Sequence, residues 1–258
     1  DEEIDPTGVD ELTIGCREPG SRNMKGYIAE AIIFSRKVNE AERLVIENYL
    51  AAKYGIAVST DYYSYESTHY YDVAGISQEN GGEQHTESTS SLITISSADL
   101  TADGSHFFVG HDNGSISSYE RTEVPASNAI TLEREWRVDF DGLSNNENIL
   151  FDLDFTAISD SDLKSNAQYD TYSLLVDSYG DFSISNDQNV YELDNNGDYT
   201  LPIDSLSPGD YLKIAVATRL QAPQNFTAQS NMYERATLSW DAVSKDILGY
   251  PLLPIGDI

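Results

Sequence analysis

The stretch that decides the fold is GYIAEAIIFSRKVNEAERLVIENYLAAKYGI, residues 26–56. Its first part, 28–34, is a short apolar run rich in β-branched residues and closed by an aromatic one, which is typical of a buried strand. Asn39 then offers a side-chain oxygen to the free amides of a helix, and Glu42 completes a capping box three residues later. Gly55 stands where a helix commonly ends in a left-handed residue. The stretch therefore predicts one strand, a turn and one helix with both ends marked.

The amino-acid sequence of this stretch also resembles that of a known family. GYIAEAIIFSR, NEAERLVIENYLAAKYGI and, upstream, LTIGCR at 12–17 resemble the last strands and C-terminal helix of the concanavalin A-like, or laminin G-like, jelly rolls of secreted bacterial proteins. A complete jelly roll needs roughly 150 residues or more. We therefore expect 1–57 to be the C-terminal part of such a domain, with the family's sugar- and calcium-binding loops mostly outside this chain. The resemblance implies a fold and a secreted or cell-surface bacterial setting.

The charge of the chain excludes several partners. Its 258 residues carry 44 acidic and 15 basic side chains, for a formal net charge of −29. Phosphates would be repelled, which argues against nucleic acid and against docking on anionic lipid. No run is long enough to span a bilayer, so we expect no membrane insertion. Three compatible interpretations of the acidic excess remain: a hydrated surface, calcium binding, and adaptation to salty water.

The middle of the chain repeats short strands with turn signals between them. LEREWRVDF at 132–140 alternates, with Leu132, Trp136 and Val138 on its apolar face. The stretch 148–155 alternates in the same way. Such spacing predicts an antiparallel sandwich. Motifs such as YYDVAGI at 70–76 resemble a β-sandwich module of unassigned role found beside jelly rolls in large bacterial surface proteins.

The end of the chain resembles a third module. APQNFTAQ at 222–229 and ATLSWD at 236–241 resemble the first two strands of a fibronectin type III domain, which needs roughly 90–100 residues. The predicted organisation is therefore a jelly-roll fragment (1–57), a β-sandwich module (58–220) and a truncated fibronectin type III start (221–258). The predicted fold class is mainly β: an antiparallel sandwich with one short α-helix near the N-terminus and incomplete flanking modules.

A search for catalytic motifs argues against an enzyme. The sequence has no His-Glu-x-x-His zinc pair, no Gly-x-Ser-x-Gly elbow and no phosphate-cradling glycine loop. Cys16 is the only cysteine, and we expect it to pack as a small hydrophobe. Asp152 and Asp154 share a strand face, but the outer glutamates of the jelly-roll glycosidase pattern are absent.

Calcium is the cofactor for which the sequence offers candidates. The run 194–198, DNNGD, places oxygen ligands at alternate positions, but it also fits a hairpin turn between two short strands. Two further clusters, around 112 and around 177–181, have the same composition, and sequence alone leaves open whether several loops join in one site. The candidate metal ligands are Asp112, Asp177, Asp181, Asp194, Asn196 and Asp198.

Clustered tyrosines raise the possibility of a sugar site. Tyr62, Tyr63 and Tyr65 are the candidates, because exposed tyrosine rings stack on pyranose rings. The alternative is that these tyrosines form the contact between the helix-bearing segment and the sandwich.

We predict a non-catalytic part of a secreted multidomain bacterial surface protein that acts as a spacer and contacts glycans or cell-surface polymers, with neighbouring modules of the same chain as further partners. The alternative is an accessory region of a secreted polysaccharide-degrading enzyme.

Overall fold

The structure, a computed structural model, confirms a mainly β fold with antiparallel sheets. It describes residues 14–16, 23–121, 129–144, 146–154, 156–158, 172–182, 189–193, 197–217, 225, 227–231, 235–239 and 241. The chain divides into two compact units, Asp1–Asn39 and Glu40–Ile258. No helix in the described part of the chain has the length and apolar character that crossing a membrane requires.

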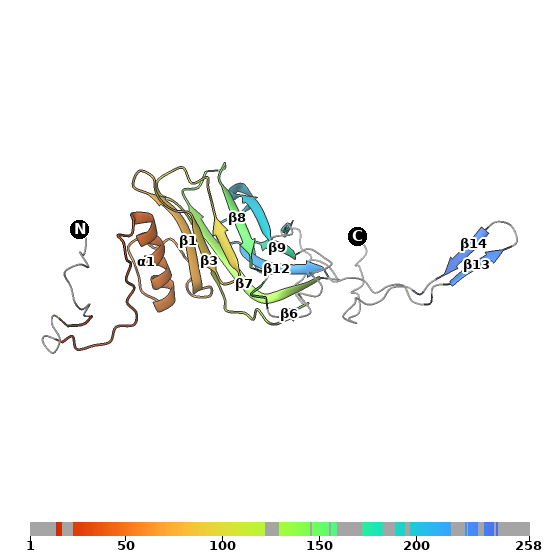
Figure 1. The fold of residues 1–258 in the computed structure, drawn as a ribbon, viewed down its shortest axis with the longest axis horizontal. Helices are drawn as coiled ribbons and strands as arrows, with labels where there is room; N and C mark the ends of the chain where they lie inside the picture. Colours follow the sequence, from red (N-terminus) through yellow and green to blue (C-terminus); the bar gives the residue numbers. More distant parts are fainter. Residues whose placement is uncertain are drawn as a thin grey trace. The chain divides into compact units, whose positions relative to one another are not determined.

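The second unit contains one helix followed by strands (Figure 1). In chain order the elements are α1 (Glu40–Tyr54), β1 (Tyr71–Glu79), β2 (Glu83–His85), β3 (Glu87–Ser90), β4 (Ile93–Ser96), β5 (Ser105–His111), β6 (Tyr119–Glu120), β7 (Ala129–Asp141), β8 (Asn148–Leu153), β9 (Tyr172–Asp177), β10 (Asn189–Glu192), β11 (Asp198–Pro202), the 3-10 turn η2 (Ile203–Ser205), β12 (Tyr211–Ala217), β13 (Thr227–Asn231) and β14 (Arg235–Ser239).

Two antiparallel sheets form the sandwich. The larger sheet has the order β10-β9-β12-β7-β5-β1-β2, with β6 paired to β7, and the smaller sheet has the order β11-β8-β4-β3. Between them lies one apolar core, to which β7 contributes Leu132, Trp136 and Val138, each fully buried. The indole Nε1 of Trp136 donates to the carbonyl of Ser90 on the smaller sheet at 3.1 Å. The alternation in 132–140 and 148–155 thus predicts the observed inward faces, within the described residues.

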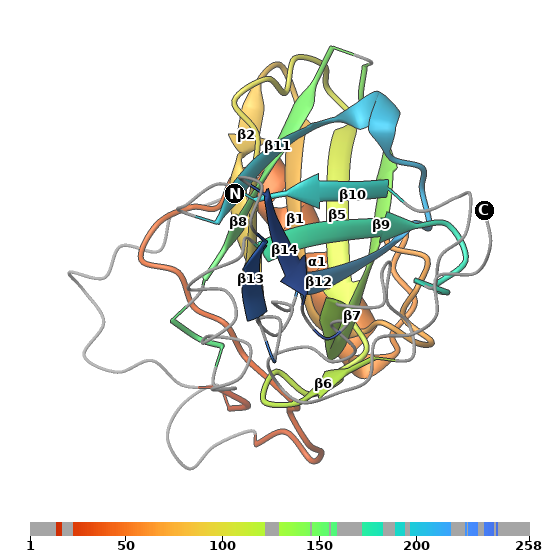
Figure 2. The ribbon, with the colours of Figure 1, turned by 90° about the vertical axis from the view of Figure 1, so that its right-hand side faces the viewer.

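Helix α1 packs on the outer face of the larger sheet. Leu44, Val45 and Ala52 of the helix form an apolar cluster with Val73 of β1 and Phe108 of β5. In Figure 2 the helix lies behind β1 and β5, on the side away from β8 and β11. The sequence analysis places this helix in the segment 1–57, whereas the structure groups it with the sandwich in the unit Glu40–Ile258.

Both ends of α1 lie where the sequence predicts them. Asn39 directly precedes the helix. At the C-terminal end Gly55 has φ +62° and the Ile56 amide donates to the Ala51 carbonyl at 3.1 Å, which is the Schellman arrangement. The free backbone N–H of Glu40 donates to the Glu83 carboxylate at 2.8 Å, so that the first turn is fixed to the β1–β2 turn.

The buried strand predicted at 28–34 is wrong. These residues are extended but belong to no strand, and Ile28, Ile33 and Phe34 are each about half exposed, at 47 %, 63 % and 45 %. A strand requires a neighbour for its backbone N–H and C=O groups. Within the described residues of the first unit, no strand is present to provide one.

The hairpin predicted across Asn196-Gly197 is also wrong. β10 pairs with β9 in the larger sheet, whereas β11 pairs with β8 in the smaller one. The chain therefore passes from the larger sheet at β10 to the smaller sheet at β11. Gly197 has φ +97°, as a turn residue.

The fibronectin-like start contains a real hairpin. β13 and β14 pair antiparallel, with Thr227 opposite Ser239 and Asn231 opposite Arg235. Trp240, which is part of the resemblance, lies outside the described residues.

Helix α1 begins at one end of the sandwich, and the last sandwich strand, β12, ends at the other. Glu40 lies at the end where β1 turns into β2, as its bond to Glu83 shows. β12 runs antiparallel to β7, and its last residue, Ala217, lies opposite Ala129 at the start of β7. That start extends past His111, the last residue of β5, which pairs with Trp136. Ala217 is therefore at the far end from Glu40.

Candidate functional site

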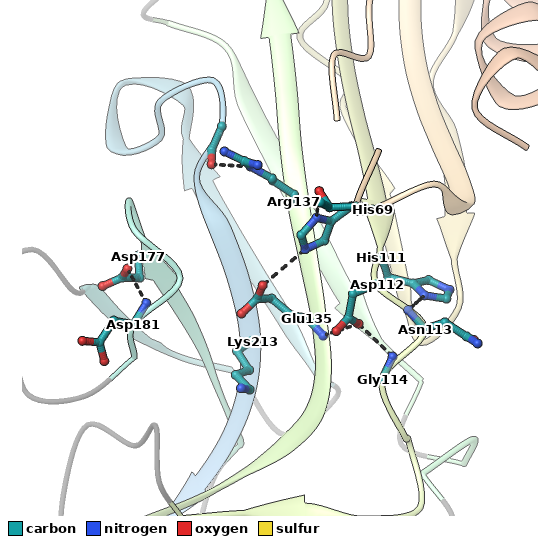
Figure 3. A network of polar contacts seen from close by, with 12 residues as sticks. His69, His111, Asp112, Asn113, Gly114, Glu135, Arg137, Asp177, Asp181 and Lys213 are labelled. Atoms are coloured by element: carbon teal, nitrogen blue, oxygen red, sulfur yellow. Dashed lines mark hydrogen bonds and ion pairs between the residues drawn. The ribbon is translucent and has the colours of Figure 1, made fainter. Parts of the chain in front are cut away.

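Polar side chains gather where the segment between α1 and β1 crosses the outer face of the larger sheet (Figure 3). Tyr63 anchors this segment: its ring is fully buried, and its hydroxyl donates to the carbonyl of His69 at 2.8 Å. Burial raises the pKa of this phenol well above its usual range, because the charged form would lose its hydration. Tyr63 therefore stays a neutral donor.

His69 ties the end of the segment to β7. Its Nε2 lies 3.2 Å from Oε1 of Glu135, and its Nδ1 lies 2.8 Å from the hydroxyl of Thr68. The ring is 4 % exposed and packs edge-on against Tyr211 at 5.6 Å between centroids. Hydroxyl, imidazole and carboxylate are the groups of hydrolase triads. Here the ring is enclosed by packing, and the same contacts fasten the segment to the sheet.

Arg137 lies between two tyrosine rings. Its guanidinium carbon is 3.8 Å from the ring centroid of Tyr65 and 4.3 Å from that of Tyr211. Its Nε donates to the Gly209 carbonyl at 3.0 Å. A guanidinium on an aromatic face is attracted by the ring quadrupole, so this stack holds Tyr65 of the crossing segment against β7 and β12.

Gly110 makes the close approach of the segment possible. A methyl group at this position would come closer than 3.0 Å to the carbonyl oxygen of His69 and to the hydroxyl of Tyr63. The absence of a side chain on β5 therefore leaves the space that the crossing segment occupies.

A second cluster lies at the end of the sheet where β5 stops. The backbone N–H of Asn113 donates to Nδ1 of His111 at 3.0 Å, so this nitrogen carries no proton. The proton is then on Nε2, which donates to Oδ2 of Asp72 at 3.1 Å. Burial lowers the pKa of His111 despite the opposing effect of Asp72. The structure thus fixes one neutral tautomer.

His111 is the third ring of an aromatic column. Tyr70 stacks on Tyr71 with centroids 4.2 Å apart, and Tyr71 stacks on His111 at 5.9 Å with an interplanar angle of 11°. His111 in turn meets Trp136 edge-on at 6.3 Å. The column leads from the partly exposed Tyr70, 36 % accessible, to the sandwich core.

Arg134 braces the turn beside this column. Its Nε donates to the Gly114 carbonyl at 2.8 Å, and its Nη1 donates to the hydroxyl of Ser91. Nη2 lies 3.5 Å from the Asn113 side-chain oxygen. Desolvation lowers the pKa of Arg134, with Asp112 and Asp72 acting in the opposite direction. Three contacts of this arginine are thus made within the protein.

The predicted calcium ligands do not gather in one place within the described residues. Asp112 accepts from the amides of Gly114 at 2.8 Å and Glu135 at 3.1 Å, so it serves the turn. Asp177 and Asp181 meet in one loop, where Oδ1 of Asp177 accepts from the Asp181 amide at 3.2 Å. In the part of the chain described, no three His, Cys, Asp or Glu side chains form a group suited to a metal.

The remaining calcium candidates do not extend this site. Asp198 begins β11 and pairs with Asp152 of β8. Asp194 and Asn196 lie outside the described residues. Oδ2 of Asp177 is buried and has no hydrogen-bond partner among the described residues.

The three predicted sugar-binding tyrosines belong to the contact between the helix and the sheet. Tyr63 has no exposed face, which rules it out as a stacking surface, and Tyr62 and Tyr65 are partly buried against the same apolar cluster. Tyr62 also lies 3.9 Å from His106, ring to ring. The arrangement matches the packing alternative of the sequence analysis.

Sequence reasoning did not find the polar anchors His69, Glu135 and Arg137. The sequence did indicate Glu135 and Arg137, since the outer face of 132–140 carries charged residues. Their partners, however, come from a segment far away in the chain. The aromatic column was missed for the same reason, since it joins Tyr71 to His111 through β1–β5 pairing.

Comparison with protein families assigns the chain to a class without a known activity. The sequence matches the domain of unknown function DUF8202 over residues 42–207, which is more than half of the chain. The chain belongs to this family. The matched range includes most of α1 together with the strands from β1 to β11. No curated protein and no solved structure matches the chain.

Proposed function

We propose that the chain is a non-catalytic part of a secreted or cell-surface multidomain bacterial protein, with a β-sandwich that acts as a spacer and contacts glycans or other cell-surface polymers. One observation carries this proposal: the compact unit starts with α1 at Glu40, and its last sandwich strand ends at Ala217, at the opposite end of the sandwich. A domain traversed from end to end adds its full length to a series of modules.

The anchored crossing segment supports the same role. Pulling on Glu40 would act first on α1 and then on the segment held by Tyr63, His69 and Arg137. These contacts join the segment to β7 and β12, in the middle of the larger sheet, rather than to an edge strand. A force along the chain is thereby distributed over several strands.

Single-molecule force spectroscopy tests the spacer role. We expect the full chain, held by its two ends, to show one cooperative event for the sandwich with a contour-length gain of about 55–60 nm, from the extended length per residue. Tyr63→Phe should lower the force of this event, whereas Tyr179→Ala, at an exposed loop tyrosine, should not. Unfolding in many small steps at forces indistinguishable from the instrument noise would contradict the proposal.

The non-catalytic part of the proposal has its own test. Thr68, His69 and Glu135 are the groups that would act if the chain hydrolysed an ester. We expect equal, background rates of nitrophenyl acetate hydrolysis for the full chain and for Thr68→Val. A rate that exceeds the background and is lost in Thr68→Val would overturn this part.

The proposal includes a calcium site in one loop, residues 177–181. Asp177 and Asp181 are the predicted ligands that the structure brings together, and Oδ2 of Asp177 is the buried oxygen that a cation would satisfy. Thermal unfolding with millimolar calcium and then with chelator tests this. We expect calcium to raise the midpoint of thermal unfolding of the unmodified chain but not that of Asp181→Asn. A shift below about 1 °C in the unmodified chain would refute calcium binding at this loop.

The alternative, an accessory region of a polysaccharide-degrading enzyme, shares the spacer role and differs in the neighbouring domains. A glycosidase domain in the same polypeptide would favour the alternative, and a long series of modules would favour the first proposal.

A further inference from the structure

We infer that the outer end of the aromatic column, formed by Tyr70, Tyr71 and Asp72 beside Asn113, is a binding site for a neutral pyranose ring. This deepens the proposed glycan contact and rests on it. It moves the contact away from Tyr62, Tyr63 and Tyr65 to a different place, the sheet end at which β1 begins and β5 stops.

The first step of the argument is the column itself. Tyr70 has one ring face on Tyr71, and its other face has no aromatic partner among the described residues. Behind it Tyr71 is backed by His111, which is 1 % exposed and meets the buried Trp136. The outer ring is therefore supported from the core, so little conformational entropy is lost when a ligand stacks on it.

The second step is the kind of polar group that surrounds the exposed ring. The Asp72 side chain is 62 % exposed, and while Oδ2 accepts from His111, Oδ1 has no hydrogen-bond partner among the described residues. The Tyr70 hydroxyl donates its proton to Tyr71 at 2.8 Å, which leaves its lone pairs to accept. The Tyr71 hydroxyl, which accepts from Tyr70, keeps its own proton to donate, so the exposed polar groups offer acceptors together with a donor, as the hydroxyl groups of a sugar require.

The third step is the exclusion of anionic ligands. Arg134, which interacts electrostatically with Asp72 and Asp112, directs hydrogen bonds to Gly114, Ser91 and Asn113 within the protein. An anionic ligand would meet the exposed Asp72 carboxylate, which repels it. A neutral pyranose suits this surface, because its apolar C–H face can stack on the Tyr70 ring. The hydroxyl groups at its edge can form hydrogen bonds with the polar groups around that ring.

The backbone places Asp72 for this role. Asp72 has φ +44° and directly follows the two stacked tyrosines, in the region where the register between β1 and β5 shifts. An aspartate tolerates this conformation better than most residues. The carboxylate is thereby set beside the column rather than in line with the outward side chains of β1.

The experiment is an NMR titration of the full chain, labelled with ¹⁵N, with the methyl pyranosides of glucose, galactose, mannose and N-acetylglucosamine. We expect fast-exchange shifts at residues 70–73 and 112–114 for at least one pyranoside, with a Kd of about 1 mM or weaker, as a single stacked ring provides. Tyr70→Ala should weaken this binding by about tenfold, the loss expected for one aromatic contact.

Two more variants make the test specific. Asp72→Asn keeps the rings and suits a positive φ, and it should weaken binding several-fold through loss of the charged acceptor. Tyr179→Ala removes a tyrosine that is 75 % exposed at another place and should leave the binding unchanged. Unfolding midpoints of the variants establish that each is folded.

Three results would overturn the inference: no pyranoside shifts these residues, Tyr70→Ala binds as tightly as the parent, or tetramethylammonium or glucuronate binds here in place of the neutral sugars. Each would leave the spacer role untouched, because the spacer role is measured by force and not by ligand binding.

Discussion

Replacing Gly110 by alanine should detach the segment that crosses the sheet. The added methyl group would come closer than 3.0 Å to the carbonyl oxygen of His69 and 2.7 Å from the hydroxyl of Tyr63. The carbonyl belongs to the backbone, so the conflict cannot be relieved by a change of rotamer. Overpacking of this kind costs about 1–3 kcal/mol. If the segment moves away, the buried hydrogen bond of Tyr63 is lost as well, which costs about 1–3 kcal/mol more.

We therefore expect Gly110→Ala to lower the free energy of unfolding by about 2–6 kcal/mol, measured by urea denaturation with circular dichroism. Gly81→Ala is the control without a steric conflict, because no atom lies within 4 Å of the added carbon, although Gly81, unlike Gly110, has a positive φ (+78°). It isolates the backbone cost of a left-handed residue, about 1–2 kcal/mol.

Hydrogen exchange separates a local from a global effect. In Gly110→Ala the amides of 61–70 should exchange faster, whereas those of β8 and β4 in the other sheet should change little. The double variant with Tyr63→Phe should regain only part of the loss, because the His69 carbonyl remains in the way. The reasoning is refuted if Gly110→Ala costs no more than Gly81→Ala.

Three further outcomes are expected. Trp136→Phe removes the hydrogen bond to Ser90 between the sheets and should cost about 1–3 kcal/mol in urea denaturation, while a cost near zero would show that the bond is dispensable. Asn48→Ala removes two bonds that join α1 to 60–62 and a third, within the helix, to the Leu44 carbonyl. It should lower the thermal midpoint by several degrees, about 2–4 °C for each kcal/mol in a chain of this size, and an unchanged midpoint would contradict this. Burial lowers the pKa values of His106 and His111 below the ordinary 6.5, so the unfolded chain binds protons first and stability should fall as the pH drops below about 6.5. His111→Gln should reduce this slope in unfolding free energy against pH, and an unchanged slope would exclude His111 as a contributor.

The fold was predictable wherever a local pattern determines which face is buried. Alternation in 132–140 identifies the inward residues of β7, and Gly55 marks the end of α1 because only the local chain is involved. The strand expected at 28–34 failed because apolar composition does not supply a pairing partner.

The site was less predictable because its contacts join distant segments. The bond between His69 and Glu135 spans 66 positions and depends on a missing side chain at Gly110. Tyr62, Tyr63 and Tyr65 were predicted as a sugar site and pack between helix and sheet, because composition cannot tell a packed tyrosine from an exposed one. The partners of β10 and β11 were missed because turn chemistry does not say which sheet each strand joins.

The outermost strands of both sheets have a consequence for crowded surfaces. β2 has three residues and begins with Glu83, β10 has four and ends with Glu192, and β11 ends at Pro202. Short strands, carboxylates and a proline leave few free backbone groups for a strand of another molecule to pair with. Copies of this chain brought close together would thus resist pairing edge to edge, and the large negative charge would keep them apart.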